Sequence, residues 1–474
     1  MGLKIGGQIE KIDGRELTYT DFVKNYFEKN EPVVLKGLMD DWRACKDWVF
    51  DNGKPNLLLF KNNFGKSQVQ VADCSCREFT DQKRVEMSVS EFVDQWLKIS
   101  SKESCSGSGQ VNNGPAVLYL KDWHFVKEYP EYTAYETPQF FLDDWLNFYL
   151  DNYSMHRDPD PHKEINDICC SDYRFAYMGA KGTWTPFHAD VFRSYSWSAN
   201  VCGKKYWLFL SPSQCHLAFD RHMKSSVYDV FDDIDQKKFP GFEKAIWLEC
   251  TQEQNEIVFV PSGWYHQVHN LEDTISINHN WFNGFNLSWV WDLLLRDYHE
   301  AREYIEDIKD ICDDFEGLCQ RNLAVNTGMN FYDFFIFMVH FSLANVVLLD
   351  YLARNCGNPL DSSSLTVPHL VLNLKSIREI ALRMKSVVVP PRSCAVSLDI
   401  FQIMEDSAFL ALCKVLARTY DAIHKEQKQS YDIRVNDFLG LDCLKGSSSE
   451  LHTPENLVNF IDSTFSRLSG LSSG

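Results

Sequence analysis

Apolar and polar residues alternate in short runs between residues 171 and 284, and this alternation predicts β-strands with one face toward a core. In residues 194–201 the even positions carry serine or asparagine, and the odd positions carry tyrosine, tryptophan, alanine and valine. Residues 274–281 set threonine, serine and asparagine against isoleucine, histidine and tryptophan in the same way. Each run taken alone also fits a half-exposed antiparallel strand. Because the polar faces hold no Lys or Glu, they favour a narrow polar cavity inside a barrel or double sheet.

The regions on either side of these strands have different patterns, which divides the chain into three parts. Residues 1–114 mix short helices and strands and indicate an N-terminal α/β region that supports the core. Residues 115–285 hold most of the predicted strands, and residues 286–474 have helical periodicity. The expected class is therefore α+β, with a helical region that packs on the barrel or on a second subunit. Helices are predicted at 287–304, 331–352, 370–384, 400–424 and from Thr453-Pro454 onward, and exposed loops at 100–115 and 156–168.

Composition and charge narrow the possible partners and compartments. The formal net charge is −19, from 47 basic and 66 acidic residues, which disfavours direct binding of nucleic acid and favours a basic protein or peptide. The 15 cysteines show no paired zinc-site spacing, so free thiols in a reducing compartment are expected. The most apolar window, residues 334–349, is shorter than a membrane span needs. We therefore expect a soluble, cytoplasmic protein, and the sequence leaves the nucleus open.

Candidate metal ligands stand in the strand-rich region. His188 and Asp190 follow a turn-forming proline and are two positions apart, so on an extended strand both side chains would project to one side. A third ligand is expected about 80 residues later, where His266 follows a turn. Two histidines and one carboxylate form a facial triad that leaves open positions on Fe(II). His-x-Asp alone is a common pattern, and a surface polar pair or a buried structural histidine is the alternative.

Two other histidines compete with His266 for the third position. His269 has the opposite parity on the same predicted strand, so only one of the two can face the cavity. His279 shares the apolar side with Ile277, which favours a structural role. A cation is also expected near the metal if the cosubstrate is a dicarboxylate, and Lys205 is the best candidate. The alternative is a solvated lysine at the strand edge, which describes its neighbour Lys204 better.

Together these residues resemble the JmjC family of Fe(II)- and 2-oxoglutarate-dependent oxygenases. The similarity covers about residues 115–285, which would be the JmjC catalytic domain, and implies a double-stranded β-helix of the jelly-roll or cupin type. It implies that iron is held by His188, Asp190 and His266, with 2-oxoglutarate and O₂ as cosubstrates. The matching motifs are Thr185-Pro186-x-His188-x-Asp190, Gly203-x-Lys205, Val260-Pro261-Ser262-Gly263-Trp264-x-His266 and Asn278-x-Asn280.

The resemblance also implies the residues that contact 2-oxoglutarate. Lys205 would pair with the distal carboxylate, assisted by Tyr119 and Thr185, and Asn278 and Asn280 would lie near the other end. One position departs from the pattern of close relatives. The asparagine that they carry on the strand between the aspartate and the lysine appears here as Ser198 or is displaced to Asn200. The contacts on that side of the cosubstrate are therefore left open.

The function that the resemblance implies is hydroxylation of a protein side chain, coupled to the oxidative decarboxylation of 2-oxoglutarate. Motifs at residues 118–124, 186–194 and 277–286 resemble a branch of lysyl hydroxylases whose substrate is the eukaryotic translation termination (release) factor, at the lysine of an Asn-Ile-Lys-Ser loop. An N-methyl-lysine demethylase and a non-catalytic scaffold are the alternatives. An aspartate at 190, where many demethylases have glutamate, and the absence of zinc-binding reader motifs favour hydroxylation.

Overall fold

The computed structural model describes residues 2–103, 117–155, 171–355, 365–387, 398–424 and 451–471. The chain divides into two compact units. The first unit, Met1–Pro138 with Tyr173–Asn280, is built on β-sheets, and the second, Gln139–Asp172 with Trp281–Gly474, is helical. The N-terminal residues and the strand-rich region thus share one unit, while the three-part division of the sequence stays a prediction. Of the expected loops, residues 104–115 and 156–168 lie outside the described residues.

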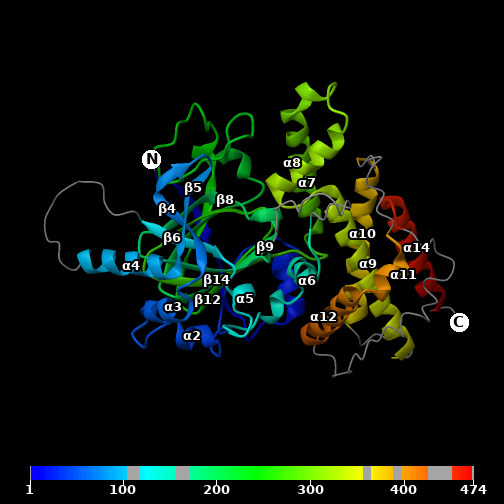
Figure 1. Cartoon of the computed structure of the whole chain (residues 1–474), viewed down its shortest axis with the longest axis horizontal. Coiled ribbons are helices and arrows are strands. Elements are labelled where there is room, and N and C mark those ends of the chain that lie inside the picture. The colour runs from blue at the N-terminus through cyan, green and yellow to red at the C-terminus, as the bar shows by residue number, and fades with distance from the viewer. Residues whose placement is uncertain are drawn as a thin grey trace. The chain divides into compact units, whose positions relative to one another are not determined.

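Two sheets form the first unit (Figure 1). The smaller sheet has the order β1-β11-β10-β13-β8, with β1 Lys4–Gln8, β8 Trp184–His188, β10 Lys205–Leu210, β11 Ile246–Gln252 and β13 Tyr265–Asn270. The larger sheet has the order β2-β3-β12-β9-β14-β7-β6-β4-β5, with β2 Lys11–Asp13, β3 Val33–Lys36, β4 Gln68–Glu78, β5 Asp81–Ser88, β6 Leu118–Trp123, β7 Arg174–Gly179, β9 Tyr195–Cys202, β12 Glu256–Val260 and β14 Thr274–Trp281.

Eight of these strands make a double-stranded β-helix. Strands β7, β14, β9 and β12 lie in one sheet, and β8, β13, β10 and β11 in the other, with antiparallel pairing inside each group. The chain therefore passes repeatedly from one sheet to the other as it runs from β7 to β14. This arrangement confirms the jelly-roll core that the resemblance to the JmjC family implied, and the double sheet that the alternating strands favoured. It also brings residues from distant parts of the sequence together between the two sheets.

Alternation within the strands sorts side chains between the two faces of the smaller sheet. Trp207 and Phe209 of β10 belong to a core cluster with Val258 and Val260 of the larger sheet, so they face inward. Leu208, one position away, belongs to a different cluster that covers the outer face. Residues between β10 and β11 fold over that outer face through short 3₁₀ turns at Cys215–Ala218 and Phe242–Lys244. The chain then enters β11 at Ile246, a strand that the sequence pattern did not predict.

The N-terminal residues add strands and helices to this core. Strand β1 pairs in parallel with β11, and β3 pairs antiparallel with β12, so both sheets are extended. Helix α4 begins after Ser88, whose hydroxyl and Glu91 form a reciprocal capping box, and it continues through residues 100–103, which were expected to be a loop. The other helical segments are α1 Tyr19–Phe22, a π-helix at Val23–Phe27, α2 Arg43–Asp47, α3 Leu57–Phe64 and α5 Phe125–Glu128.

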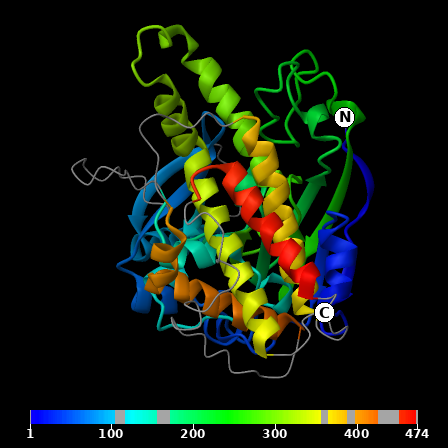
Figure 2. The same ribbon diagram turned by 90° about the vertical axis from the view of Figure 1, so that its right-hand side faces the viewer.

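The second unit consists of helices (Figure 2). Helix α10 lies beside both α9 and α14. The predicted helix over 400–424 is interrupted at Asp406, and the helix over 315–327 was not predicted. Its described elements are a 3₁₀ turn at Gln139–Phe141, α6 Trp145–Asn152, α7 Leu287–Tyr304, a 3₁₀ turn at Glu306–Ile308, α8 Phe315–Thr327, α9 Phe331–Asn355, α10 Thr366–Lys385, α11 Ile400–Glu405, α12 Ser407–His424 and α14 Pro454–Leu471.

Helix α9 is long and apolar enough, by length and composition alone, to cross a membrane. Its apolar stretch Phe331–Leu352 has 22 residues, so the expectation that this segment is too short for a span is wrong. Within the structure, however, 83% of its most apolar window is buried. A helix that is apolar on all sides and enclosed by protein is typical of the core of a soluble domain. Its length therefore carries little weight as a sign of a membrane segment.

Candidate metal and cosubstrate site

Two neighbouring strands of the smaller sheet bring the candidate histidines together. Strands β8 and β13 pair antiparallel, and His188 lies opposite His266 in their register. The centroids of the two imidazole rings are 4.3 Å apart. The turn before β13 contains Gly263 at φ +74°, a conformation that favours glycine. This turn returns the chain antiparallel to β8, so the 78-residue separation between the histidines in sequence is closed by sheet pairing.

The side chain of Asp190 also lies beside the two histidines, but its local backbone structure differs from the one predicted. Strand β8 ends at His188, so His188 and Asp190 do not share an extended strand as expected. Asp190 instead precedes a 3₁₀ turn at Val191–Arg193. Its Oδ2 accepts a hydrogen bond of 2.6 Å from Ser196 Oγ on strand β9. The carboxylate is therefore oriented from the larger sheet, while the histidines come from the smaller one.

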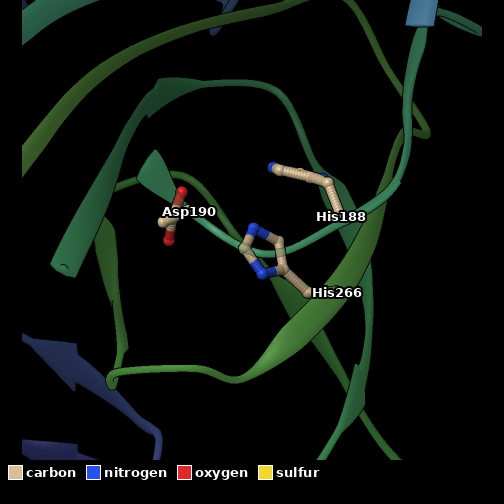
Figure 3. Close-up of side chains that lie close together, drawn as sticks. All are labelled: His188, Asp190 and His266. Atoms are coloured by element: carbon tan, nitrogen blue, oxygen red, sulfur yellow. The ribbon is translucent and has the colours of Figure 1, made fainter. Parts of the chain in front are cut away.

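The three side chains point toward one another (Figure 3). One ligand atom from each of His188, Asp190 and His266 lies within 4.8 Å of the others. His188 Nδ1 lies 2.7 Å from the carbonyl oxygen of Pro186, and His266 Nδ1 lies 3.2 Å from that of Trp264. Because a carbonyl oxygen only accepts, each Nδ1 carries the proton. The lone pair on each Nε2 is then available to a metal, as in other sites where the second ring nitrogen is hydrogen-bonded.

Burial keeps His266 in the form that binds metals. Desolvation, followed by the proximity of His188, lowers the pKa of His266 to about 4, although Asp190 acts in the opposite direction. The ring is therefore neutral at physiological pH. A neutral imidazole is the species that coordinates a metal. Two imidazoles and one carboxylate fit a ferrous ion with open positions.

The competing histidines have structural partners. His269 lies on the opposite side of β13 from His266. Its ring stacks on that of Trp184, with centroids 5.5 Å apart, and its Nε2 lies 2.8 Å from Gln267 Nε2. His279 is buried, contacts the hydroxyl of Tyr135 and packs on Trp197 at 4.2 Å. Desolvation holds the pKa of His279 well below its usual range. Both histidines are thus accounted for by packing, as their positions on the strands predicted.

Lys205 is a buried cation that has no acidic partner within the described part of the chain. Its Nζ donates a 2.7 Å hydrogen bond to Ser276 Oγ, and among the described residues no carboxylate lies within ion-pair distance. The side chain is 2% exposed, and desolvation lowers its pKa to about 7. A buried ammonium group is costly unless a counter-ion joins it. The carboxylate of a bound ligand would supply that counter-ion. Asn278 also donates to Ser276 Oγ, at 3.2 Å, so Lys205 and Asn278 converge on one hydroxyl.

Ser198 and Asn200, between which the sequence left the choice open, each have a buried oxygen without a hydrogen-bond partner among the described residues, Ser198 Oγ and Asn200 Oδ1. Asn200 Nδ2 donates to the carbonyl oxygen of Gly203 at 2.7 Å, so this side chain braces the turn between β9 and β10. Ser198 Oγ is buried and has no hydrogen-bond partner among the described residues. Ser198 shares a strand face with Ser196, which contacts Asp190. Which of the two side chains contacts the cosubstrate therefore stays open.

The other residues predicted to contact 2-oxoglutarate are Tyr119, Thr185 and Asn280. Tyr119 is buried and packs edge-to-face on Tyr177, and Thr185 lies opposite Val268 between β8 and β13. Among the described residues, no hydrogen bond joins either side chain to Lys205. Asn280 donates to Ser194 Oγ at 3.3 Å. Their roles toward 2-oxoglutarate stay predictions.

Two serines that the sequence reasoning did not assign belong to this site. Ser196 holds the carboxylate of Asp190, and Ser276 receives the hydrogen bond of Lys205. Both serines lie on the polar faces of the alternating strands, so the sequence pattern placed them on the correct side. The pattern does not show which strands lie opposite each other, and the contacts of the two serines depend on that.

Comparisons with known proteins agree with this geometry. Residues 19–287 match a family described as a cupin-like domain. The chain is 56% identical to the Arginine-specific demethylase JMJ20 of Arabidopsis thaliana, over 98% of this chain and 99% of that protein. It is 41% identical to the 2-oxoglutarate and iron-dependent oxygenase JMJD4 of Danio rerio, over 74% of this chain and 79% of that protein. The chain is also 37% identical to the 2-oxoglutarate and iron-dependent oxygenase JMJD4 of Homo sapiens, over 68% of this chain and 72% of that protein.

Proposed function

The chain belongs to the cupin-like JmjC oxygenases, and from this premise we propose that it is an Fe(II)- and 2-oxoglutarate-dependent protein oxygenase. The observation that carries the proposal is the convergence of His188, Asp190 and His266 on one point between the sheets. Lys205 supports the second half of the proposal, since this buried lysine has no ion-pair partner among the described residues and needs an anion.

We assign the iron to His188, Asp190 and His266. Bound iron would supply open positions for 2-oxoglutarate and O₂, and with them the oxidation of an unactivated C–H bond coupled to formation of succinate and CO₂. The protein's own part is positional. The Nδ1 hydrogen bonds to backbone carbonyls fix the ring orientations, and Ser196 fixes the carboxylate. The apolar side chains of Trp207 and Phe209, which pack near His266, exclude water from one side of the ligands.

We assign the distal carboxylate of 2-oxoglutarate to Lys205, with Ser276 and Asn278 beside it. The ammonium group would form an ion pair with that carboxylate and orient the ketoacid end toward the metal ligands. Ser276 Oγ, which accepts from both Lys205 and Asn278, still has its own proton to donate to the ligand. Ser198 offers a further buried hydroxyl. These groups give the cosubstrate one cation and neutral donors.

The substrate that we favour is a lysine side chain of the translation termination factor, hydroxylated at carbon. The support is the similarity to JMJD4 oxygenases and to the lysyl-hydroxylase motifs, together with the net charge of −19, which suits a basic partner. Such a substrate places the protein in the cytoplasm, where termination occurs. Demethylation of methyl-arginine is the second candidate, because the relative named as an arginine-specific demethylase is 56% identical over nearly the whole chain.

One experiment separates the two candidates. The purified protein is incubated with iron, 2-oxoglutarate and either the release factor or an arginine-methylated peptide, and the products are analysed by mass spectrometry. A gain of one oxygen on the lysine supports hydroxylation, whereas loss of a methyl group from arginine supports demethylation. The His188→Ala variant, processed in parallel, should give neither product. Release factor unmodified by the wild type alongside a demethylated arginine peptide would reject the lysyl assignment.

A further inference from the structure

The outer face of the smaller sheet carries contacts directly behind the candidate metal ligands. Phe187 and Tyr265 each adjoin a ligand histidine in sequence, and alternation turns their rings away from the cavity. The two rings contact each other, with centroids 5.1 Å apart. Both belong to the apolar cluster that covers this face. Behind the two histidines, therefore, lies an aromatic pair that joins β8 to β13.

Arg193 connects the third ligand segment to the same pair. Its Nη2 donates a 2.6 Å hydrogen bond to the hydroxyl of Tyr265, and the guanidinium carbon lies 4.8 Å from the centre of that ring. Arg193 ends the 3₁₀ turn that begins one residue after Asp190, and its backbone N–H donates to the Asp190 carbonyl at 3.1 Å. The guanidinium thus connects the turn at residues 190–193, called the Asp190 turn below, to strand β13, which carries His266.

The turn that Arg193 fastens has an unfavourable backbone conformation. Phe192 and Arg193 are consecutive residues with positive φ, at 55° and 50°. Non-glycine residues rarely adopt this conformation, and it persists where surrounding contacts hold it. Phe192 is buried and packs on Tyr173, which fixes one of the two residues. The contact to Tyr265 fixes the other. Without it, the segment after Asp190 would have a more favourable conformation available.

We propose that Arg193 is a positioning residue for the metal site, acting with Tyr265 to hold the Asp190 turn in register with the two ligand histidines. This inference rests on the proposed function, because it requires that the three ligands bind a metal. Arg193 and Tyr265 contribute no ligand atom themselves. They set the distance between Asp190 and His266, and thus the affinity and geometry of the bound ion.

The test is an anaerobic titration with Co(II), read from its visible absorption spectrum and from the binding isotherm. Arg193→Leu and Tyr265→Phe should each raise the dissociation constant about tenfold and alter the ligand-field bands. Tyr265→Phe removes only the hydroxyl and retains the ring against Phe187, so folding is preserved. The double variant should bind no more weakly than the weaker single variant, because both changes break one contact. Arg193→Lys should restore part of the affinity.

Arg43 provides a matched control in the same unit. Its guanidinium carbon lies 3.8 Å from the centre of the Tyr132 ring, and its Nε donates to Asp47 Oδ2 at 2.8 Å, so its contacts in the described structure lie away from the residues that carry the three ligands. Arg43→Leu should leave Co(II) binding and its spectrum unchanged. Equal losses in Arg43→Leu, or wild-type affinity and spectrum in both Arg193→Leu and Tyr265→Phe, would overturn the positioning role. Failure of the wild-type protein itself to bind Co(II) would instead contradict the proposed function.

Discussion

Lys205 Nζ, on the smaller sheet, donates a hydrogen bond to Ser276 Oγ on the larger sheet, and this neutral hydroxyl is its only hydrogen-bond partner among the described residues. A cation buried in this way is poised for an anion that the described part of the chain does not supply. We therefore expect Lys205 to lower the stability of the ligand-free protein and to dominate the affinity for 2-oxoglutarate.

Replacement of Lys205 by methionine should separate these two effects. The free energy of unfolding of the ligand-free protein should rise, because the fall of the lysine pKa from 10.5 to about 7 corresponds to a cost of at most about 5 kcal/mol. The affinity for 2-oxoglutarate should fall about a hundredfold with loss of the charged hydrogen bond. Denaturant titration and calorimetric binding measure the two quantities. Lys204→Met is the control, since Lys204 pairs with Glu253 near the surface. A Lys205→Met protein with undiminished 2-oxoglutarate affinity would refute the assignment.

Binding of 2-oxoglutarate should weaken as the pH rises above about 7. The ammonium form of Lys205 pairs with the carboxylate, so above the pKa of about 7 binding must take up a proton. The dissociation constant should then rise up to tenfold per pH unit. Because the pKa of Lys205 is lowered only in the folded state, the unfolded chain holds more protons between pH 7 and 10.5, and the free energy of unfolding rises with pH over this range. The free-energy cost of burying the ammonium group is full below pH 7 and vanishes toward pH 10.5. Calorimetry in buffers of different ionisation enthalpy measures the proton uptake. In Lys205→Arg the pH dependence should disappear, and its persistence there would point to another group.

Removal of the buried hydroxyl of Ser198 should have opposite effects on folding and on binding. Because Ser198 Oγ has no hydrogen-bond partner among the described residues, Ser198→Ala should raise the free energy of unfolding by about 1 kcal/mol. If the hydroxyl meets 2-oxoglutarate, the same change should weaken its binding about fivefold. Thermal unfolding with and without 2-oxoglutarate provides both readouts. Asn200→Ala should instead destabilise the protein regardless of ligand, since Asn200 braces a turn. Unchanged 2-oxoglutarate binding in Ser198→Ala would remove Ser198 from the site.

The support of Asp190 by Ser196 should be visible in metal affinity. Ser196→Ala removes the 2.6 Å hydrogen bond to Asp190 Oδ2 and should weaken Fe(II) binding about tenfold. His269→Gln, on the opposite side of β13 from His266, should bind Fe(II) as the wild type does. Competition with a calibrated chelator under anaerobic conditions gives both dissociation constants. Weaker binding in His269→Gln than in Ser196→Ala would mean that the third ligand was wrongly chosen.

The sequence carried the main features of the fold, because these depend on local periodicity, whereas the set of three metal ligands came from motifs that resemble a known family. Alternation identified strands of the jelly roll, and strand parity showed that only one of His266 and His269 could lie on the metal-binding side. The helical periods of α7, α9 and α10 likewise matched the structure closely. Periodicity was informative here because a side chain's direction on a strand or helix follows from its position alone.

Features that depend on pairing between distant strands could not be read in this way. Asp190 lies beyond the end of β8, so its direction comes from a turn with two positive φ angles rather than from strand parity. The partnership of Lys205 with Ser276 requires β10 and β14 to face each other across the cavity. The contact from Arg193 to Tyr265 likewise joins residues 72 positions apart. Strand β11 was missed because it follows a charged segment without clear alternation.

The most direct measurement of the central claim is succinate formation from 2-oxoglutarate, followed with the release factor present, in the wild type and in His188→Ala. The wild type should form succinate in a one-to-one ratio with hydroxylated lysine. His188→Ala should form neither above the level without enzyme, while it remains folded by circular dichroism. Succinate formation by His188→Ala at the wild-type rate would contradict the assignment of His188, Asp190 and His266 as the iron site.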